Sequence, residues 1–223
     1  MGKIISFANQ KGGVGKTTSA VNIASSLGVL GYKTLLVDLD PQGNATSGVG
    51  IAKKSLKYTI KDVLMNEIPV KEAIITTEFK NLSLIPSNMS LAGTEFDLLQ
   101  EDTAEPWAAM RTAFSVIKEE YDYIIIDTAP VGPVADTLII APFADATIYV
   151  CRANYTAKDD LQLLNHMYAE STLKNVSIVL NGVDMTKRKY GYYYGYGSYS
   201  RYGKYRHGQY GQYGYGPEIS IKS

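Results

Sequence analysis

The sequence predicts an α/β fold, a three-layer sandwich in which a mostly parallel central sheet lies between two layers of helices. Short apolar runs of strand length alternate along the chain with longer amphipathic stretches of helix length. Several of the runs are apolar at consecutive positions, as strands buried on both faces should be. Strand, helix and strand in succession imply right-handed crossovers, which place helices on both faces of a parallel sheet.

The expected elements follow one another in regular alternation. Strands are predicted at residues 3–8, 33–37, 82–86, 123–126, 146–151 and 176–180. Helices are predicted from their apolar periodicity at residues 16–30, 59–66, 89–100, 106–120, 133–141 and 157–173.

Polar or glycine-bearing segments follow four of these strands, at residues 9–16, 38–43, 127–130 and 181–184. Ligands of open parallel sheets bind beyond the carboxyl ends of the strands. We therefore expect the four segments to converge on one site.

The composition changes after Asp184. Residues 190–216 form a Tyr/Gly repeat with interspersed Lys and Arg, and they hold 11 of the 18 tyrosines but no aliphatic residue. Such a segment cannot bury a core. The sequence thus predicts one domain at residues 1–186 and a flexible Tyr/Gly-rich tail at residues 187–223.

The overall composition is that of a packed globular domain. The 223 residues suffice for one sizeable core, and 22 basic residues balance 22 acidic ones, so net charge does not indicate nucleic acid or membrane as a partner. The single cysteine, Cys151, lies in an apolar run and fits a reducing cytoplasm. Residues 1–7 predict a first strand and not a signal peptide. No apolar run approaches the ~20 residues that span a bilayer.

The loop after the first strand reads Lys-Gly-Gly-Val-Gly-Lys-Thr-Thr over residues 11–18. Its glycines allow close backbone approach, and its N–H groups together with the helix N-terminus would form an anion cradle. We expect Lys16 to reach the β- and γ-phosphates and the Thr17 hydroxyl to ligate Mg²⁺, as in a P-loop NTPase. The expected nucleotide-binding residues here are Gly12, Gly13, Val14, Gly15, Lys16, Thr17 and Thr18.

Three carboxylates and one amide follow the other strands. Asp38 and Asp40 are spaced so that they would share a face if the chain stays extended, although such a pair alone also fits a solvated turn. Asp127 ends an apolar strand, a pattern typical of a carboxylate that holds Mg²⁺ through water. Asn181 is expected to contact adenine, with an ordinary turn residue as the alternative.

The glycine-rich loop departs from the usual P-loop pattern, because Gln10 replaces the first glycine and Lys11 adds a second lysine. In this it resembles the deviant Walker A ATPases of the ParA/MinD superfamily. The resemblance implies binding and hydrolysis of MgATP, with catalytic roles for Lys11, Lys16 and Asp40. Lys11 would contact phosphate oxygens across a nucleotide-sandwich dimer, Asp40 would orient or deprotonate the nucleophile, and Asp38 would support Mg²⁺ or its waters.

Different parts of the chain resemble two lineages of this superfamily. Residues 1–100 resemble the ParA/Soj chromosome-partitioning ATPases, notably at residues 40–48 and 85–88. Residues 121–216 resemble the bacterial tyrosine autokinases of capsular polysaccharide export, on Asp-Thr-Ala-Pro-Val-Gly from residue 127, Arg-Ala-Asn-Tyr-Thr from residue 152 and the tail. Residues 101–120 match neither family, so the chain looks chimeric.

The first hypothesis is a tyrosine autokinase that phosphorylates the tail of a neighbouring copy, with a membrane-bound activator and a place at the inner face of the membrane. The second is a cytoplasmic ATP-gated dimer switch of the partitioning type, with DNA and a ParB-like protein as partners. The third is a hybrid that binds nucleotide without further activity. Expected phosphoacceptors are Tyr190, Tyr192, Tyr193, Tyr194, Tyr196, Tyr199, Tyr202, Tyr205, Tyr210, Tyr213 and Tyr215. Alternatively, the tail is a low-complexity linker or binds single-stranded nucleic acid.

Overall fold

The computed structural model describes residues 2–94, 108–130, 140, 143–169, 173–184 and 186. The chain divides into two units, Met1–Val183 and Asp184–Ser223, and the sheet with its helices belongs to the first. All eleven expected phosphoacceptor tyrosines lie outside the described residues, as do most of the helix expected at 133–141 and residues 95–100.

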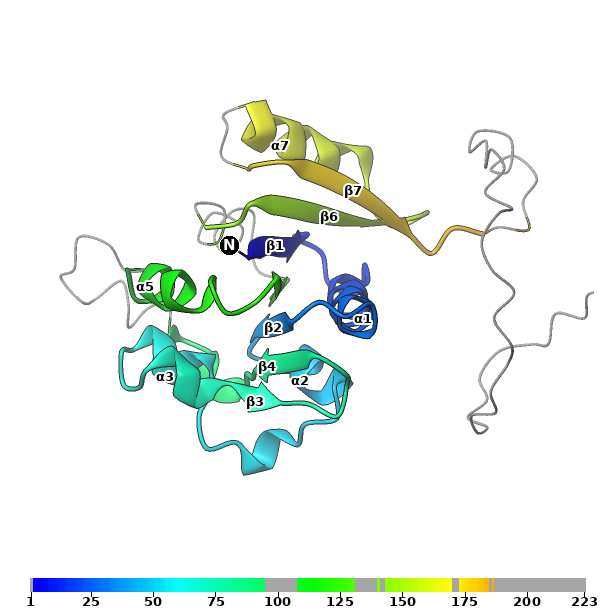
Figure 1. Cartoon of the computed structure of the whole chain (residues 1–223). Coiled ribbons are helices and arrows are strands. Elements are labelled where there is room, and N and C mark those ends of the chain that lie inside the picture. Colours follow the sequence, from blue (N-terminus) through cyan, green and yellow to red (C-terminus); the bar gives the residue numbers. More distant parts are fainter. Residues whose placement is uncertain are drawn as a thin grey trace, which may run out of the picture. The chain divides into compact units, whose positions relative to one another are not determined.

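A seven-stranded sheet forms the centre of the first unit, in the order β3-β4-β2-β5-β1-β6-β7 (Figure 1). Neighbouring strands are parallel except β3 and β4, which pair antiparallel at one edge. The predicted α/β fold with a mostly parallel sheet is thereby confirmed. The strands are β1 Lys3–Ala8, β2 Thr34–Leu39, β3 Ile75–Thr76, β4 Leu82–Ile85, β5 Tyr123–Thr128, β6 Ala146–Arg152 and β7 Val176–Asn181.

Helices cover both faces of this sheet. Helices α1 and α2 lie on one face, and α3 and α5 lie on the other (Figure 1). The bounds are α1 Lys16–Val29, α2 Asn44–Gly48, α3 Ile60–Leu64, α5 Ala108–Ile117 and α7 Lys158–Ala169, with 3₁₀ turns η1 Lys53–Ser55, η2 Val70–Ala73 and η3 Met89–Leu91. No described helix is long and apolar enough to cross a membrane.

One predicted helix begins differently from its expectation. The helix expected from residue 89 starts as the 3₁₀ turn η3, in which the Asn88 side chain accepts a hydrogen bond from Ser90 N–H. Ala92 is extended and Gly93 has a φ of +89°, so the backbone leaves the helical conformation after η3 and is helical again at Thr94. Local side-chain capping and the glycine outweigh the helical periodicity here.

Three apolar clusters hold the layers together. The α1 face buries Phe7, Leu36 and Ile125, and the opposite face packs the other side of the same strands against α3 and α5. A third cluster joins β6 to α7 and includes Cys151, which is buried, as the apolar run around it indicates. Because the central strands are buried on both faces, their carboxyl ends are fixed in register, with Asp127 beside both Phe7 and Asp38.

Candidate nucleotide-binding site

The loop between β1 and α1 is shaped by glycines in left-handed conformation. Gly13 has a φ of +72°, and Gly15, the N-cap of α1, has a φ of +102°. A Cβ atom on Gly15 would lie 2.3 Å from Asn181 Nδ2. The backbone angle therefore favours glycine at position 15, and any side chain there would also displace the Asn181 amide.

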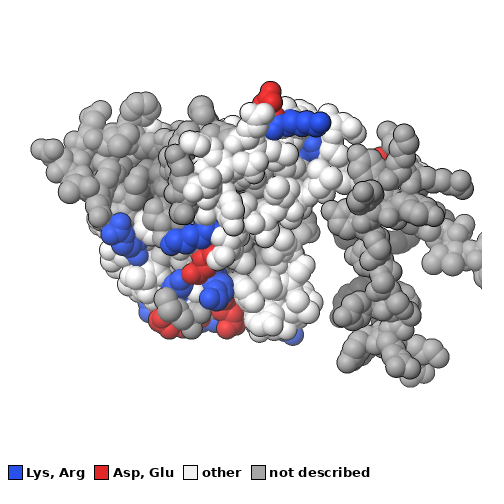
Figure 2. All heavy atoms as spheres, turned by 90° about the horizontal axis from the view of Figure 1, so that it is seen from above, with Lys and Arg blue, Asp and Glu red and all other residues white. Residues whose placement is uncertain are grey.

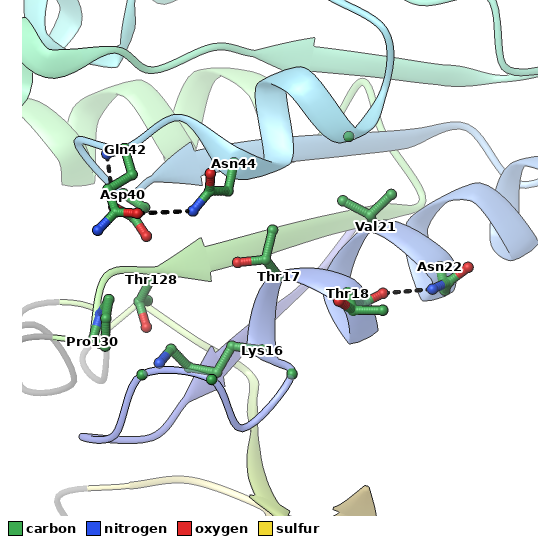
Figure 3. Close-up of a pocket in the computed structure, with 14 residues that line it drawn as sticks. Lys16, Thr17, Thr18, Val21, Asn22, Asp40, Gln42, Asn44, Thr128 and Pro130 are labelled. Carbon is green, nitrogen blue, oxygen red and sulfur yellow. Dashed lines mark hydrogen bonds between the residues drawn. The ribbon is translucent and has the colours of Figure 1, made fainter. Parts of the chain in front are cut away.

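A cavity of about 740 Å³ opens above this loop (Figure 3). That volume lies within the range of roughly 300–1,000 Å³ that small-molecule sites occupy. Three of the four predicted segments contribute to its wall. Its lining residues are Gly12, Gly13, Gly15, Lys16, Thr17, Thr18, Val21, Asn22, Asp40, Gln42, Asn44, Gly48, Thr128 and Pro130. The Val14 side chain instead packs in the core on the α1 face.

Lys16 lies folded over the loop that carries it. Its ammonium group donates to the Asn9 carbonyl over 2.9 Å and to the Lys11 carbonyl over 3.2 Å, and the residue is only 5% exposed. The positive charge is thus held at the cavity wall by backbone oxygens, which an anionic ligand can replace.

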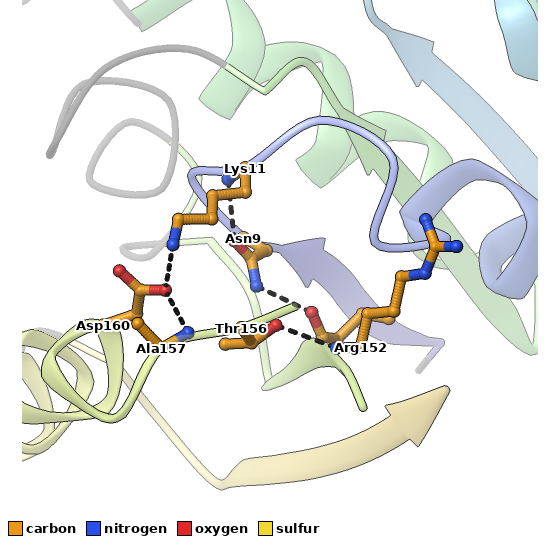
Figure 4. Close-up of polar contacts among 7 residues, drawn as sticks. Asn9, Lys11, Arg152, Thr156, Ala157 and Asp160 are labelled. Carbon is orange, nitrogen blue, oxygen red and sulfur yellow. Dashed lines mark hydrogen bonds and ion pairs between the residues drawn. The ribbon is translucent and has the colours of Figure 1, made fainter. Parts of the chain in front are cut away.

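Lys11 forms an ion pair with Asp160 of α7, over 2.7 Å (Figure 4). Asp160 also accepts the Ala157 N–H over 2.9 Å, so one carboxylate both caps α7 and holds the lysine. The hydrogen bond from Lys11 lowers the pKa of Asp160. The second lysine of the loop is therefore not among the residues that line the cavity.

The two acidic residues after β2 have different surroundings. Asp38 is fully buried, and its Oδ2 accepts two 2.7 Å hydrogen bonds, from Thr46 N–H and from the Thr46 hydroxyl. Burial raises the pKa of Asp38 although these bonds act to lower it. Asp38 thereby anchors the start of α2 and does not line the cavity. Asp40 does line it, with its Oδ1 accepting Gln42 N–H over 2.8 Å.

Asp127 is a buried carboxylate beside the Thr17 hydroxyl and the Lys16 charge. It is 0% exposed, and neither of its oxygens has a hydrogen-bond partner among the described residues. Burial, together with nearby Asp38 and Asp40, raises the pKa of Asp127 to about 7, although the nearby Thr17 hydroxyl and Lys16 act to lower it. A bound cation would satisfy this carboxylate.

These surroundings fit Mg²⁺ better than a metal held by protein ligands alone. No group of three or more His, Cys, Asp or Glu side chains able to hold a metal lies in the described part of the chain. Mg²⁺ is usually bound through one or two carboxylates together with water and substrate phosphates. Thr17 and Asp127 provide a hydroxyl and a buried carboxylate for that purpose.

Asn181 contacts the glycine-rich loop and is not among the residues that line the cavity. Its Nδ2 donates to the Val14 carbonyl over 2.9 Å. Beside it, Arg152 Nη1 donates to the Gly13 carbonyl over 3.0 Å. The fourth predicted segment therefore meets the loop backbone, and the adenine contact expected of Asn181 stays a prediction.

Sequence reasoning missed several residues at the site. Thr128 follows Asp127 directly, and its hydroxyl donates to the Phe7 carbonyl over 2.8 Å. Its place after a strand end is a signal that could have identified it. Asn44 comes from α2, a five-residue helix that the sequence did not predict. Asp160 gave no such signal, because it begins a surface helix far along the chain.

Comparison with known proteins gives a family match over most of the chain. A family model described as an AAA domain (AAA_31) matches residues 2–180. The sporulation initiation inhibitor protein Soj of Bacillus subtilis is 39% identical over 188 residues, which cover 83% of this chain and 73% of that protein. The chromosome partitioning protein ParA of Myxococcus xanthus is 42% identical over 166 residues, or 74% of this chain and 58% of that protein.

The fold also matches solved structures. A crystal structure of cobyrinic acid a,c-diamide synthase from Mycobacterium smegmatis, with bound ATP analogue and magnesium, gives a TM-score of 0.70 at 29% sequence identity. The match covers 81% of this chain and 75% of that one.

These matches bear on the chimeric interpretation of the sequence. The family match runs without interruption through residues 101–120, where two different halves were expected to join. Soj and ParA are sporulation and chromosome-partitioning proteins, so the resemblance of residues 121–216 to tyrosine autokinases receives no support from them.

Proposed function

This chain belongs to the AAA domain family that matches residues 2–180, and we propose that it is an ATPase of the ParA type that works as an ATP-gated dimer switch in chromosome or plasmid partitioning. The observation that carries the proposal is one cavity whose wall holds both the glycine-rich loop and Asp40, with the buried carboxylate of Asp127 beside the Thr17 side chain of that wall. The similarity to Soj and ParA supports it.

The proposed binding step uses the loop and the start of α1. The loop N–H groups and the α1 N-terminus receive the phosphates, and Lys16 exchanges the carbonyls of Asn9 and Lys11 for β- and γ-phosphate oxygens. Thr17 and Asp127 would hold Mg²⁺, which when bound neutralises charge on those oxygens. The charged form of Asp127 would then gain a bound cation as a partner.

The proposed hydrolytic step uses Asp40. Its carboxylate lines the cavity and is 4% exposed, and its Oδ1 is fixed by Gln42 N–H. We assign to Asp40 the orientation of the attacking water and the acceptance of its proton. Lys11 would have to leave Asp160 before it could contact phosphate across a dimer.

The partners of the partitioning role are part of the proposal. The chain spans 58% of ParA and 73% of Soj, so those proteins contain chain beyond the matched part. On the face shown in Figure 2, the described basic and acidic side chains are interspersed and form no field of one sign. DNA and a ParB-like protein are therefore proposed from the relatives and not from a charged surface.

ATP-dependent dimerisation tests this function. Light scattering of Asp40→Ala with MgATP is expected to give twice the monomer mass, because ATP stays bound when its hydrolysis is blocked. With MgADP, or in Lys16→Ala, the mass should stay that of a monomer. A monomeric Asp40→Ala protein at saturating MgATP would rule out the dimer switch.

A second candidate, tyrosine autophosphorylation, is favoured by one observation alone, the 11 tyrosines of residues 190–216. Each phosphate would add about 1.5–2 negative charges at neutral pH. Mass spectrometry after incubation with MgATP would detect tail phosphotyrosine, and Lys16→Met is the control. Equal phosphorylation of both proteins would exclude this candidate.

A further inference from the structure

Two consecutive carbonyl groups of the glycine-rich loop accept hydrogen bonds from side chains at the ends of β6 and β7. Arg152 donates to the Gly13 carbonyl and Asn181 donates to the Val14 carbonyl, over 3.0 and 2.9 Å. Arg152 and Asn181 are partners in the β6–β7 register. One rung of the sheet therefore presents both donors to the loop.

These bonds fix the direction of two amide groups. A trans peptide is planar, and its C=O and N–H point in opposite directions. The Gly13 carbonyl shares a peptide with the N–H of Val14, and the Val14 carbonyl shares one with the N–H of Gly15. Because each carbonyl oxygen is held by a donor, the N–H of the same peptide is held pointing away from that donor. Without such donors, the peptides between Gly13 and Gly15 could rotate, because glycine restricts its backbone least.

The two donors are themselves held in place. Asn181 Oδ1 accepts the N–H of Gly182 over 2.8 Å, which orients the amide so that Nδ2 meets Val14. The Arg152 guanidinium lies 5.5 Å from the centre of the Tyr155 ring. The Arg152 N–H donates to the Thr156 hydroxyl over 2.8 Å, which anchors the strand end (Figure 4).

We propose that Arg152 and Asn181 are positioning residues, which set the Val14 and Gly15 amides for a phosphate group; this inference rests on the proposed binding of MgATP. It gives Asn181 a role different from adenine contact. A residue that positions the loop acts on the triphosphate of any ligand, whereas a residue that contacts adenine acts on the base.

The test compares ligands that share the triphosphate and differ in the base. Isothermal titration calorimetry of the full chain would measure Kd for ATP, GTP and inorganic tripolyphosphate, each with Mg²⁺. In Arg152→Met, which loses a charged donor, we expect all three Kd values to rise about tenfold. In Asn181→Ala, which loses an amide donor, we expect all three to rise about fivefold. Lys54→Met removes an exposed charge in the 3₁₀ turn η1 and should leave all three unchanged.

Further measurements separate positioning from folding. Arg152→Lys keeps a charged donor, so its Kd values should lie within about threefold of the wild type. The Tm of each variant is also measured without ligand. If the variants act by positioning the loop and not by weakening the fold, their Tm values should not rank in the same order as their Kd values.

Three results would overturn the inference. A loss confined to ATP, with tripolyphosphate unaffected, would assign Asn181 to the base. If the wild type binds MgATP and Arg152→Met and Asn181→Ala bind as tightly as the control Lys54→Met, the proposed function stands and the positioning role is refuted. A wild type that binds no MgATP would overturn the proposed function and the inference together.

Discussion

Asp127 is a residue whose charge the fold tolerates poorly without a cation. Because burial raises its pKa to about 7 from an unfolded value near 3.8, the folded state keeps a proton that the unfolded chain releases between these values. The free energy of unfolding should therefore fall as pH rises through this window. Without ligand, the Tm of both proteins is expected to fall between pH 5 and pH 8. This fall should be about 5 °C smaller in Asp127→Asn than in the wild type.

Calorimetric or fluorescence melting curves at the two pH values would check this. Saturating MgATP should remove most of the difference, because a bound cation stabilises the charged carboxylate. Parallel pH profiles of the wild type and Asp127→Asn without ligand would contradict the prediction.

Lys11 is a second residue whose state without ligand differs from its expected role. Its ion pair with Asp160 competes with any contact to phosphate, and ion pairs this close to solvent are weak enough to be exchanged. Asp160→Asn should therefore free Lys11 and lower the dimer Kd by about threefold at saturating MgATP, in the Asp40→Ala background. Analytical ultracentrifugation would measure it.

The neighbouring Asp159 provides the matched control. It lies in the same turn of α7 and pairs with Gln162 instead of Lys11. Asp159→Asn removes the same charge and should leave the dimer Kd unchanged. If both variants shift it equally, the effect is one of net charge and not of the release of Lys11.

Part of the site could be located from the sequence because it follows strands, although Thr128, which also follows a strand, was missed. Lys16, Thr17 and Asp40 lie at the cavity as expected, because parallel strands bring their carboxyl ends to one edge. The partner of Lys11 could not be predicted in this way. An ion pair between a loop and a distant surface helix depends on tertiary packing, which no local pattern encodes.

The same contrast holds for whole elements. The long buried strands and α1 were predicted to within two residues, because consecutive apolar positions and a glycine loop mark them clearly. The two-residue strand β3 and the five-residue helix α2 were missed. Helix α2 owes its position to Asp38, whose carboxylate binds Thr46 N–H and its hydroxyl, a contact made in three dimensions.

The packing of α1 against the start of β4 yields a prediction for an element. A Cβ atom on Gly28 would lie 2.2 Å from the Lys80 carbonyl oxygen, so Gly28→Ala must displace α1 or this turn. We expect a loss of about 2–3 kcal/mol in the free energy of unfolding, measured by urea denaturation. Gly48→Ala in α2 is the control, since its Cβ would meet Val21 at an ordinary 3.4 Å. An equal effect of both substitutions would show that the loss is not caused by this close approach.

For the whole molecule, the described core lies entirely within the first unit. All members of the three apolar clusters lie between Ile4 and Val176, and the lining residues of the cavity end at Pro130. Removal of residues 187–223 therefore takes away no described core or cavity residue. A chain ending at residue 186 should keep its Tm within about 2 °C, a change of less than about 1 kcal/mol.

The same shortened chain separates the roles of domain and tail. Its Kd for MgATP should stay within about twofold of the full chain, because each kcal/mol changes a Kd by roughly fivefold and no lining residue is lost. ATP-dependent dimerisation in the Asp40→Ala background should also persist, since the proposed switch uses the loop, Asp40 and Lys11. If the shortened chain binds MgATP but no longer dimerises, the tail takes part in subunit association, and the switch cannot be assigned to residues 1–186 alone.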